Sequence, residues 1–444
     1  MSESKMSRQG FRSVLASDVS RRSMLGGGAA VLAGIALSAC TGGGSGGSSG
    51  GGSGSALTLA TYDDAPKIPG LKDQLAQFTK QTGIQVNVDD LPGSGAAVYP
   101  GKIRTELVGG KGPDVFRTWG GSLGGPFGTS GLAIDLSKYV QQYGWDKIMP
   151  SNLMSGMKWN GTQYGLPIYQ AAIEAWYSKT AFEKAGISAP PTTYDELLAA
   201  NDKLVASGQV PLATGGKYGW HLMRLFEYLL EKNAGPDQHD QLLAGKASWD
   251  DPVVVQSFTE LKQWNDKGYL PKGVMAVDPT QVENTFTTGQ YAYTIAGAWV
   301  DSAAVQKAKD PSAYGVFELP TGKTPARHSG FVEGYMISAS SQNQDGAAKL
   351  IDFLAKPATI NALQITNSTI TAAQPDPSKY PLSASNAKLA ASQPFFTIQD
   401  QAFPPSLADQ YFQVQSQVVQ GQMTPAAAAK QMQSVVPNGL KQQQ

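Results

Sequence analysis

A serine in a Gly-x-Ser-x-Gly pattern is the first feature of the sequence that could do chemistry. Residues 120–124, GGSLG, match the nucleophile elbow of hydrolases, in which a strand runs directly into a helix and presents the serine at the turn. Gly125 and Pro126 follow the match, and such a stretch is a poor place for a helix to begin. We therefore predict a flexible turn at Ser122, while an ester hydrolase that uses Ser122 stays open as an alternative.

Two further patterns could indicate nucleotide or metal chemistry, and both are incomplete. Residues 322–324, GKT, look like the end of a phosphate-binding loop, but Phe317 stands where the first glycine is required. The three histidines, His221, His239 and His328, share no metal-ligand spacing, and one cysteine excludes a Cys-rich zinc site or a disulfide framework. We predict no metal, no cofactor and no catalytic residue. A carboxylate pair that hydrolyses glycosides stays open, because the separation of such a pair depends on the fold.

Aromatic residues beside glycines are the more informative group. Trp119 precedes Gly-Gly-Ser, Trp220 follows Lys-Tyr-Gly, and Trp299 follows Ala-Gly-Ala. These residues stand where loops leave predicted strands, and open α/β sheets bind ligands at the carboxyl ends of strands. Exposed aromatic faces suit the apolar faces of sugar rings, while polar side chains bind the hydroxyls. Core packing remains the alternative for each tryptophan taken singly.

The elements that would position these residues alternate between strand and helix. A strand over 57–62 is followed by an amphipathic helix that starts near Leu71 and closes at Gly83, and then by an alternating strand over 84–88. This order predicts a βαβ unit and a parallel sheet. Further predictions are a strand over 115–119, a capping box at residues 193–196, a helix over 347–354 and a last helix that opens at residues 424–425. The pattern is α/β throughout and too long for one sheet, so we predict two lobes.

The first 39 residues carry the marks of an export signal. Five positive and two negative charges precede an apolar stretch over 24–39, which is shorter than the roughly 20 residues a membrane-spanning helix requires. Residues 37–40, LSAC, resemble a lipobox, which predicts cleavage before Cys40 and lipidation of that cysteine. Residues 20–25, SRRSML, resemble a twin-arginine signal, and a plain Sec signal stays open.

A Gly/Ser tract and an even charge balance complete the composition. Residues 41–55 contain only Gly, Ser and one Thr, which predicts a flexible tether between the lipid and the folded body. The chain has 35 Lys and Arg against 35 Asp and Glu, and removal of 1–39 leaves 30 against 33. Neither balance gives the basic surface that nucleic-acid binding requires. The mature protein is therefore predicted to be tethered by lipid to the outer face of the cytoplasmic membrane, with no nucleic-acid partner.

Seven segments in order carry a resemblance to a known family. They are LTLATYDD with LKDQLAQFTKQTGIQVNV, GKGPDVFRTW, GLAIDLSKYV, GTQYGLPIYQAAIEAWYSKTAFEKAGISAPPTTYDEL, TFTTGQYAYTIAGAW, YGVFELP and SGFVEGYMISASSQNQDGAAKLIDFLA. Together they resemble the extracellular solute-binding proteins of ABC transporters, in the carbohydrate branch that includes maltose-binding protein. The resemblance covers nearly all of residues 56–444.

The resemblance implies an α/β fold of the type II periplasmic-binding-protein kind, with two lobes and a ligand cleft between them. Lobe 1 would comprise residues 56–167 and 318–368, and lobe 2 would comprise residues 168–317 and 369–444. The hinge would be crossed three times, near 166–170, 314–320 and 365–372.

The resemblance also implies which residues bind ligand. Trp119 occupies the position of an aromatic that stacks on sugar in maltose-binding protein, and Ser122 stands where that protein has an acid. Trp299 matches the Gly-x-Trp aromatic of the family. The full set of implied ligand-binding residues is Asp63, Asp64, Trp119, Ser122, Tyr169, Gln170, Trp220, Trp299, Glu333, Tyr335 and Phe396, with Phe395 as an alternative to Phe396.

The implied function is that of a solute-binding component of an ABC importer. It would bind a neutral mono- or oligosaccharide in the cleft by aromatic stacking and hydroxyl hydrogen bonds, and deliver it as a monomer to the permease subunits. No bond would be made or broken. A lipid-anchored hydrolase and a binding protein for a non-sugar solute remain the alternatives, although no cluster of cations or metal ligands stands at the matched positions.

Overall fold

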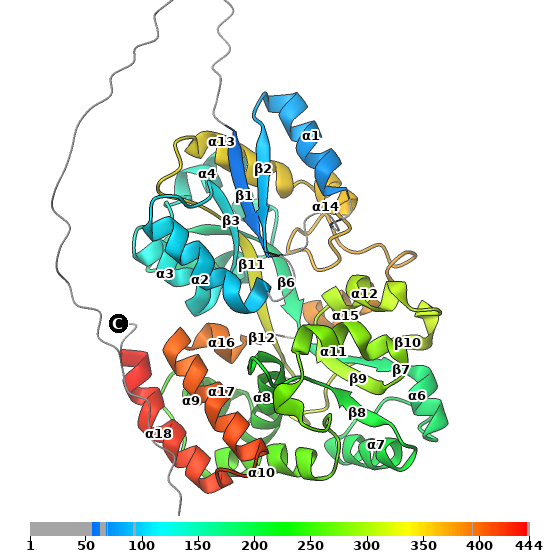
Figure 1. The fold of residues 1–444 in the computed structure, drawn as a ribbon. Coiled ribbons are helices and arrows are strands. Elements are labelled where there is room, and N and C mark those ends of the chain that lie inside the picture. The colour runs from blue at the N-terminus through cyan, green and yellow to red at the C-terminus, as the bar shows by residue number, and fades with distance from the viewer. Residues whose placement is uncertain (1–55, 63–67, 69, 92–94, 393, 442–444) are drawn as a thin grey trace, which may run out of the picture. The chain divides into compact units, whose positions relative to one another are not determined.

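The structure, a computed structural model, describes residues 56–62, 68, 70–91, 95–392 and 394–441 (Figure 1). Residues 53–444 belong to one compact unit. The predicted export signal, the lipidation at Cys40, the Gly/Ser tether, Asp63 and Asp64 lie outside the described residues. They therefore stay predictions.

A six-stranded sheet organises the first lobe. It contains β1 (Leu57–Thr61), β2 (Val86–Asp90), β3 (Val115–Trp119), β6 (Gly165–Ala172), β11 (His328–Ile337) and β12 (Phe395–Thr397). The strands β1, β2 and β3 are mutually parallel, whereas β11 runs antiparallel to β3 and to β6. The sheet is therefore mixed, with the predicted parallel unit at one edge.

The predicted βαβ start is confirmed. Helix α1 (Leu71–Thr82) buries Leu71, Leu75 and Phe78, and Gly83 caps it in the left-handed conformation with φ of 74°. Its amide donates to the Thr79 carbonyl, which satisfies one of the last carbonyls of the helix. The chain then turns into β2, which pairs with β1.

A four-stranded sheet organises the second lobe, in the order β10 (Tyr314–Phe317), β7 (Glu174–Ser178), β9 (Tyr291–Ala296) and β8 (Val210–Ala213). β9 is buried along its whole length, as are most residues of its neighbours. A short hairpin of β4 (Lys158–Trp159) and β5 (Thr162–Gln163) stands apart from both sheets.

Helices surround each sheet in Figure 1. Those near the first sheet are α1, α2 (Gly95–Val108), α3 (Gly121–Thr129), α4 (Ser137–Tyr143), α5 (Ser151–Ser155), α13 (Gln344–Leu354) and α14 (Pro357–Ala362). Those near the second are α6 (Lys179–Lys184), α7 (Tyr194–Ala206), α8 (Trp220–Ala234), α9 (Pro236–Leu243), α10 (Pro252–Asp266), α11 (Pro279–Thr285), α12 (Trp299–Ala303), α15 (Pro381–Ser392), α16 (Gln399–Ala402), α17 (Pro405–Val419) and α18 (Pro425–Lys441). The predicted capping box at Thr193, the helix that ends at Leu354 and the last helix at Pro425 are all present.

Three strand-like segments connect the two sheets. β6 belongs to the first sheet and leads through Ile173 into β7 of the second. β10 of the second sheet is followed by β11 of the first, and residues 367–371 run beside β6, where Thr369 N donates to the Ile168 carbonyl at 2.9 Å. Before β11 begins, Tyr228 of α8 donates to the Pro320 carbonyl at 2.9 Å. This contact joins residue 320 to the second lobe and favours a crossing along β11 itself.

The predicted flexible turn at Ser122 is wrong. β3 ends at Trp119, and α3 begins two residues later despite its glycines and Pro126. The glycines are needed because the helix packs closely: a Cβ at Gly128 would lie 2.3 Å from the ring of Tyr164, and one at Gly125 would lie 2.8 Å from the indole nitrogen of Trp159. Tertiary packing therefore overrides the low helix propensity of this segment.

Candidate functional site

A buried ion pair lies at the centre of the first group of candidate residues. The Glu333 carboxylate accepts hydrogen bonds from Arg117 Nε at 3.0 Å and Nη2 at 2.5 Å, and Tyr62 donates its hydroxyl to the same oxygen. Arg117 is 8% exposed and Glu333 is 7% exposed. Because a buried charge needs a partner, this geometry neutralises both groups inside the protein.

Aromatic rings cover the guanidinium and each other. The Arg117 guanidinium carbon lies 3.9 Å from the ring centroid of Tyr169 and 4.6 Å from that of Tyr62. The Tyr62 ring is stacked on Trp119, with centroids 4.4 Å apart and planes 14° from parallel. The hydroxyls of Tyr169 and Tyr335 lie 3.3 Å apart. We call these residues, with Glu333, the Trp119 cluster.

Strand register explains why these side chains meet. Glu333 of β11 pairs with Trp119 of β3 on one side and with Tyr169 of β6 on the other. Arg117 lies two residues before Trp119, and alternate residues of a strand share a face of the sheet. The neighbouring Gln170 donates its amide to the Ser368 carbonyl at 3.2 Å. The cluster therefore forms where β3 meets β11 and β6, two strands that lead toward the second lobe.

A second group lies on the other lobe around Arg224. Arg224 Nη1 donates to Glu283 Oε1 at 2.8 Å, and the indole nitrogen of Trp299 donates to Glu283 Oε2 at 3.2 Å. The Arg224 guanidinium carbon lies 4.5 Å from the ring of Trp220 and 5.0 Å from that of Trp299. Both tryptophans are half-buried, whereas Arg224 and Glu283 are buried. We call these four residues the Trp299 cluster.

Local structure places each member of the Trp299 cluster. Trp220 and Arg224 are four residues apart on α8, so they share one helix face. Trp299 begins α12 directly after β9, and Glu283 lies in α11, which Asp278 caps at its N-terminus. His221 lies beside Glu283 with Nε2 3.6 Å from Oε1, but burial holds the pKa of this imidazole well below its ordinary value. The histidine is therefore neutral, and the ion pair of this group is the one between Arg224 and Glu283.

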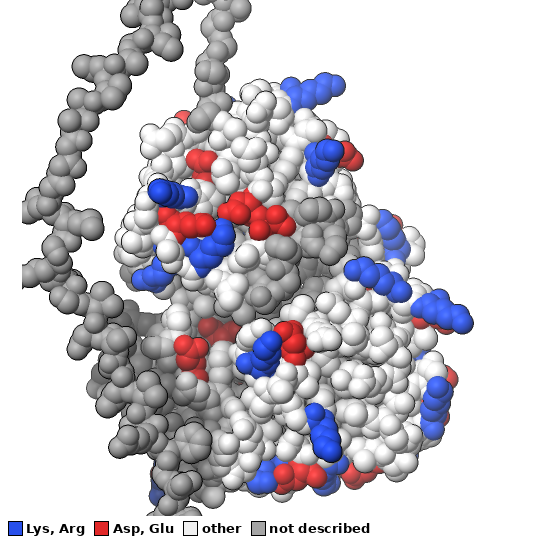
Figure 2. Space-filling model, viewed as in Figure 1, with Lys and Arg blue, Asp and Glu red and all other residues white. Residues whose placement is uncertain are grey.

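The two clusters are neighbours along β11. Phe331 and Glu333 share one face of this strand because side chains alternate. The Phe331 ring lies 6.0 Å from that of Trp299, and Glu333 belongs to the Trp119 cluster. Figure 2 shows the surface hollowed between the two lobes. The arrangement brings two aromatic groups, each with a neutralised ion pair, to the junction of the lobes.

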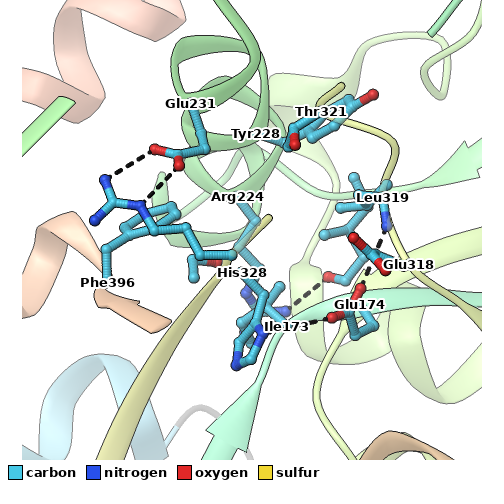
Figure 3. Close-up of a pocket in the computed structure, with 13 residues that line it drawn as sticks. Ile173, Glu174, Arg224, Tyr228, Glu231, Glu318, Leu319, Thr321, His328 and Phe396 are labelled. Atoms are coloured by element: carbon cyan, nitrogen blue, oxygen red, sulfur yellow. Dashed lines mark hydrogen bonds and ion pairs between the residues drawn. The ribbon is translucent and has the colours of Figure 1, made fainter. Parts of the chain in front are cut away.

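A small cavity adjoins the Trp299 cluster through Arg224, which is one of its lining residues (Figure 3). Ile295 is another of its lining residues. Glu174 lies between His328 and Leu319 in Figure 3. Burial raises the pKa of Glu174 to about 8. The Leu319 amide donates to the Glu174 carboxylate at 3.3 Å and lowers this pKa, whereas the negative charge of nearby Glu318 raises it further. Charged side chains, among them Glu174 and Arg224, and apolar ones, among them Ile173 and Leu319, line the cavity together.

Phe396 and Ser122 lie apart from the two clusters. Phe396 lines the small cavity, 5% exposed, with its ring 4.6 Å from that of His239. Ser122 is buried where α3 meets α16, and its hydroxyl donates to the carbonyl of Phe403 and, at 3.4 Å, to that of Asp400. These bonds hold the hydroxyl on backbone acceptors rather than on a base that would activate it as a nucleophile.

Four residues of the clusters are absent from the predicted site. The sequence presents Tyr62 and Arg117 only as parts of strands, although Arg117 precedes Trp119 by two positions and so has to share its face. Arg224 follows Trp220 by four positions in a helical run, which is a comparable signal. Glu283 carries no such signal, since it reaches the site from α11 through tertiary structure alone.

Within the described ranges, no three His, Cys, Asp or Glu side chains are grouped as metal ligands. Among the described helices, none has the length and apolar character needed to cross a membrane.

Comparisons with known proteins agree with this architecture. The family model for bacterial extracellular solute-binding proteins matches residues 41–360. A protein of Brucella abortus named as a binding protein is 29% identical over 202 residues, which cover 44% of this chain and 47% of that protein. A galactooligosaccharide-binding protein of Bacillus subtilis is 26% identical over 338 residues, which cover 73% of this chain and 74% of that protein. The chain thus spans about half the length of the first of these curated relatives.

The solved structure of a chitin oligosaccharide binding protein superposes with a TM-score of 0.78 at 23% identity, covering 88% of this chain and all of that one. Its likeness establishes the fold as that of a two-lobed α/β solute-binding protein. With the match over 41–360, the chain belongs to the bacterial extracellular solute-binding proteins. The members and the similar structures are binding proteins rather than enzymes.

Proposed function

We propose that this chain is the solute-binding component of an ABC importer and that it binds a neutral saccharide between its lobes. The Trp299 cluster carries this proposal. Two half-buried indole rings flank an Arg224–Glu283 pair, so an apolar ring face and charged hydrogen-bonding groups adjoin one another. Sugars present the matching combination of apolar faces and hydroxyls.

Charge balance favours a neutral ligand over an anionic one. Arg224 is paired with Glu283, and Arg117 is paired with Glu333, so the guanidinium charge in each cluster already has a carboxylate partner. An anionic ligand would have to break these pairs or meet their carboxylates. The relatives named for galactooligosaccharides and chitin oligosaccharides support the same class of ligand.

The transport cycle follows from differential contacts. Saccharide that binds the Trp299 cluster would also contact Tyr169, Gln170, Glu333 and Tyr335 at the lobe junction once the lobes close. A ligand shifts the balance between open and closed forms only by its extra affinity for the closed form. The permease would then recognise the closed form, while lipid on Cys40 would keep the protein at the outer face of the membrane.

Calorimetry with the mature protein tests this function. A thermal-shift screen with mono- to tetrasaccharides first identifies a ligand, because binding raises the melting temperature by mass action. Trp299→Ala is then expected to weaken binding of that ligand by about 2 kcal/mol, roughly thirtyfold, as for an aromatic anchor. Trp159→Ala is the matched control, since Trp159 is half-buried and belongs to neither cluster. Unchanged affinity in Trp299→Ala would remove the Trp299 cluster from the site.

A further inference from the structure

In this structure Tyr62 covers one face of the Trp119 ring, and little of Trp119 is exposed. Its side chain is 8% exposed, whereas Trp220 and Trp299 are half-buried. The Tyr62 ring covers it at a stacking distance of 4.4 Å with planes 14° from parallel. A saccharide stacked on that face of Trp119 would need the volume that Tyr62 occupies.

Tyr62 is held in this position from several sides. Its hydroxyl donates to Glu333, which is itself fixed by two hydrogen bonds from Arg117. The Arg117 guanidinium lies over its ring, and the buried Tyr99 ring meets it edge-on with centroids 5.3 Å apart. Displacing Tyr62 would break the hydroxyl bond to a buried carboxylate and three ring contacts, with Trp119, Tyr99 and Arg117, so the covered arrangement is stabilised from several sides.

We propose that Tyr62 sets the length of the saccharide that this protein accepts. By covering Trp119, it leaves Trp220 and Trp299 as the more exposed tryptophans of the two clusters. The site then takes a mono- or disaccharide and gains nothing from further sugar units toward β3. This inference rests on the proposed function and adds the size class of its ligand.

The test compares affinities across chain length in wild type and in Tyr62→Ala. The probes are gluco-, galacto-, xylo- and chito-oligosaccharides of one to four units, measured by calorimetry. In wild type the affinity is expected to level off at the disaccharide. Tyr62→Ala is expected to bind tri- and tetrasaccharides of the preferred series at least tenfold more tightly than wild type does, and Trp119→Ala in that background is expected to abolish the gain.

Tyr143→Ala is the matched control because it also removes a tyrosine stacked on a tryptophan of the first lobe. The centroids of the Tyr143 and Trp145 rings lie 5.4 Å apart, and the ring planes are 15° from parallel. This control is expected to keep the wild-type length profile. Acrylamide quenching gives a readout without ligand. The fluorescence of Trp119 is obtained by subtracting the signal of the matching Trp119→Phe variant. Acrylamide is expected to quench this fluorescence more strongly in Tyr62→Ala than in wild type or Tyr143→Ala.

Two results would overturn the role of Tyr62: wild-type affinity that keeps rising to the tetrasaccharide, or a length profile and quenching that Tyr62→Ala leaves unchanged. Failure of every saccharide to bind wild type and variants alike would instead refute the proposed function on which the inference rests.

Discussion

The buried carboxyl of Glu174 makes the stability of this protein depend on pH in a defined direction. Glu174 is the first residue of β7 and is 1% exposed. Its Oε2 accepts one hydrogen bond from the Leu319 amide, and its Oε1 lies 3.8 Å from His328 Nδ1. Burial raises the pKa of this carboxyl from 4.5 to about 8. The folded protein thus keeps a proton at neutral pH that the unfolded chain releases.

The size and sign of the effect follow from proton linkage. Between pH 4.5 and about 8 the folded state binds more protons at Glu174 than the unfolded state, so the free energy of unfolding falls as pH rises. The slope from this group approaches about 1.4 kcal/mol per pH unit. The contribution is fully present below pH 4.5 and is lost above the folded pKa, a total on the order of 5 kcal/mol. Glu174→Gln, which cannot ionise, is expected to remove this slope.

Urea denaturation of wild type and Glu174→Gln at several pH values from 4 to 9 measures the difference. Relative to wild type, the variant should gain stability progressively between pH 5 and 8. Asp400→Asn is the matched comparison, because burial raises the pKa of Asp400 to about 6. The pH dependence of stability that comes from Asp400 therefore ends near pH 6. If the free energies of unfolding of wild type and Glu174→Gln change in parallel between pH 6 and 8, Glu174 is already ionised in the folded state. The reasoning from burial would then be wrong.

Two other predictions concern the Trp119 cluster and the anchor. Arg117→Met leaves the Glu333 carboxylate buried without its main partner and is expected to cost about 3–5 kcal/mol in urea denaturation. Adding Glu333→Met should recover part of that loss; strictly additive costs would show that the pair does not interact. For the precursor, Cys40→Ala is expected to shift the protein from the membrane fraction to the soluble extracytoplasmic fraction, and an unchanged membrane fraction would argue against lipid on Cys40.

Local periodicity predicted the elements that lie close together in sequence. The spacing of Leu71, Leu75 and Phe78 placed α1 correctly, and Gly83 closed it. Thr193 and Glu196 form the predicted capping box. These features depend on residues within a few positions of one another, so composition and spacing were enough. The strand predicted at 115–119 is also present and ends at Trp119.

The family resemblance in seven ordered segments also predicted most of the residues that the two clusters contain. Trp119, Tyr169, Glu333 and Tyr335 do meet in one group, and Trp220 and Trp299 meet in another. Their grouping requires the register of β3, β6 and β11, which pairs residues more than 150 positions apart. The family pattern carries that register, whereas periodicity does not.

Only the tertiary structure decided which side chains fill the space between these strands. Propensity argued against a helix after Gly120, yet α3 forms because its glycines let it pack against Trp159 and Tyr164. By its sequence position Tyr62 is only the last residue of a predicted strand, but it covers Trp119 and binds Glu333. Sequence alone determined the class of fold, the order of its elements and most of the aromatic residues that the two clusters contain. Which aromatic faces stay open depends on contacts between distant segments, because packing and the pairing of buried charges are decided in three dimensions.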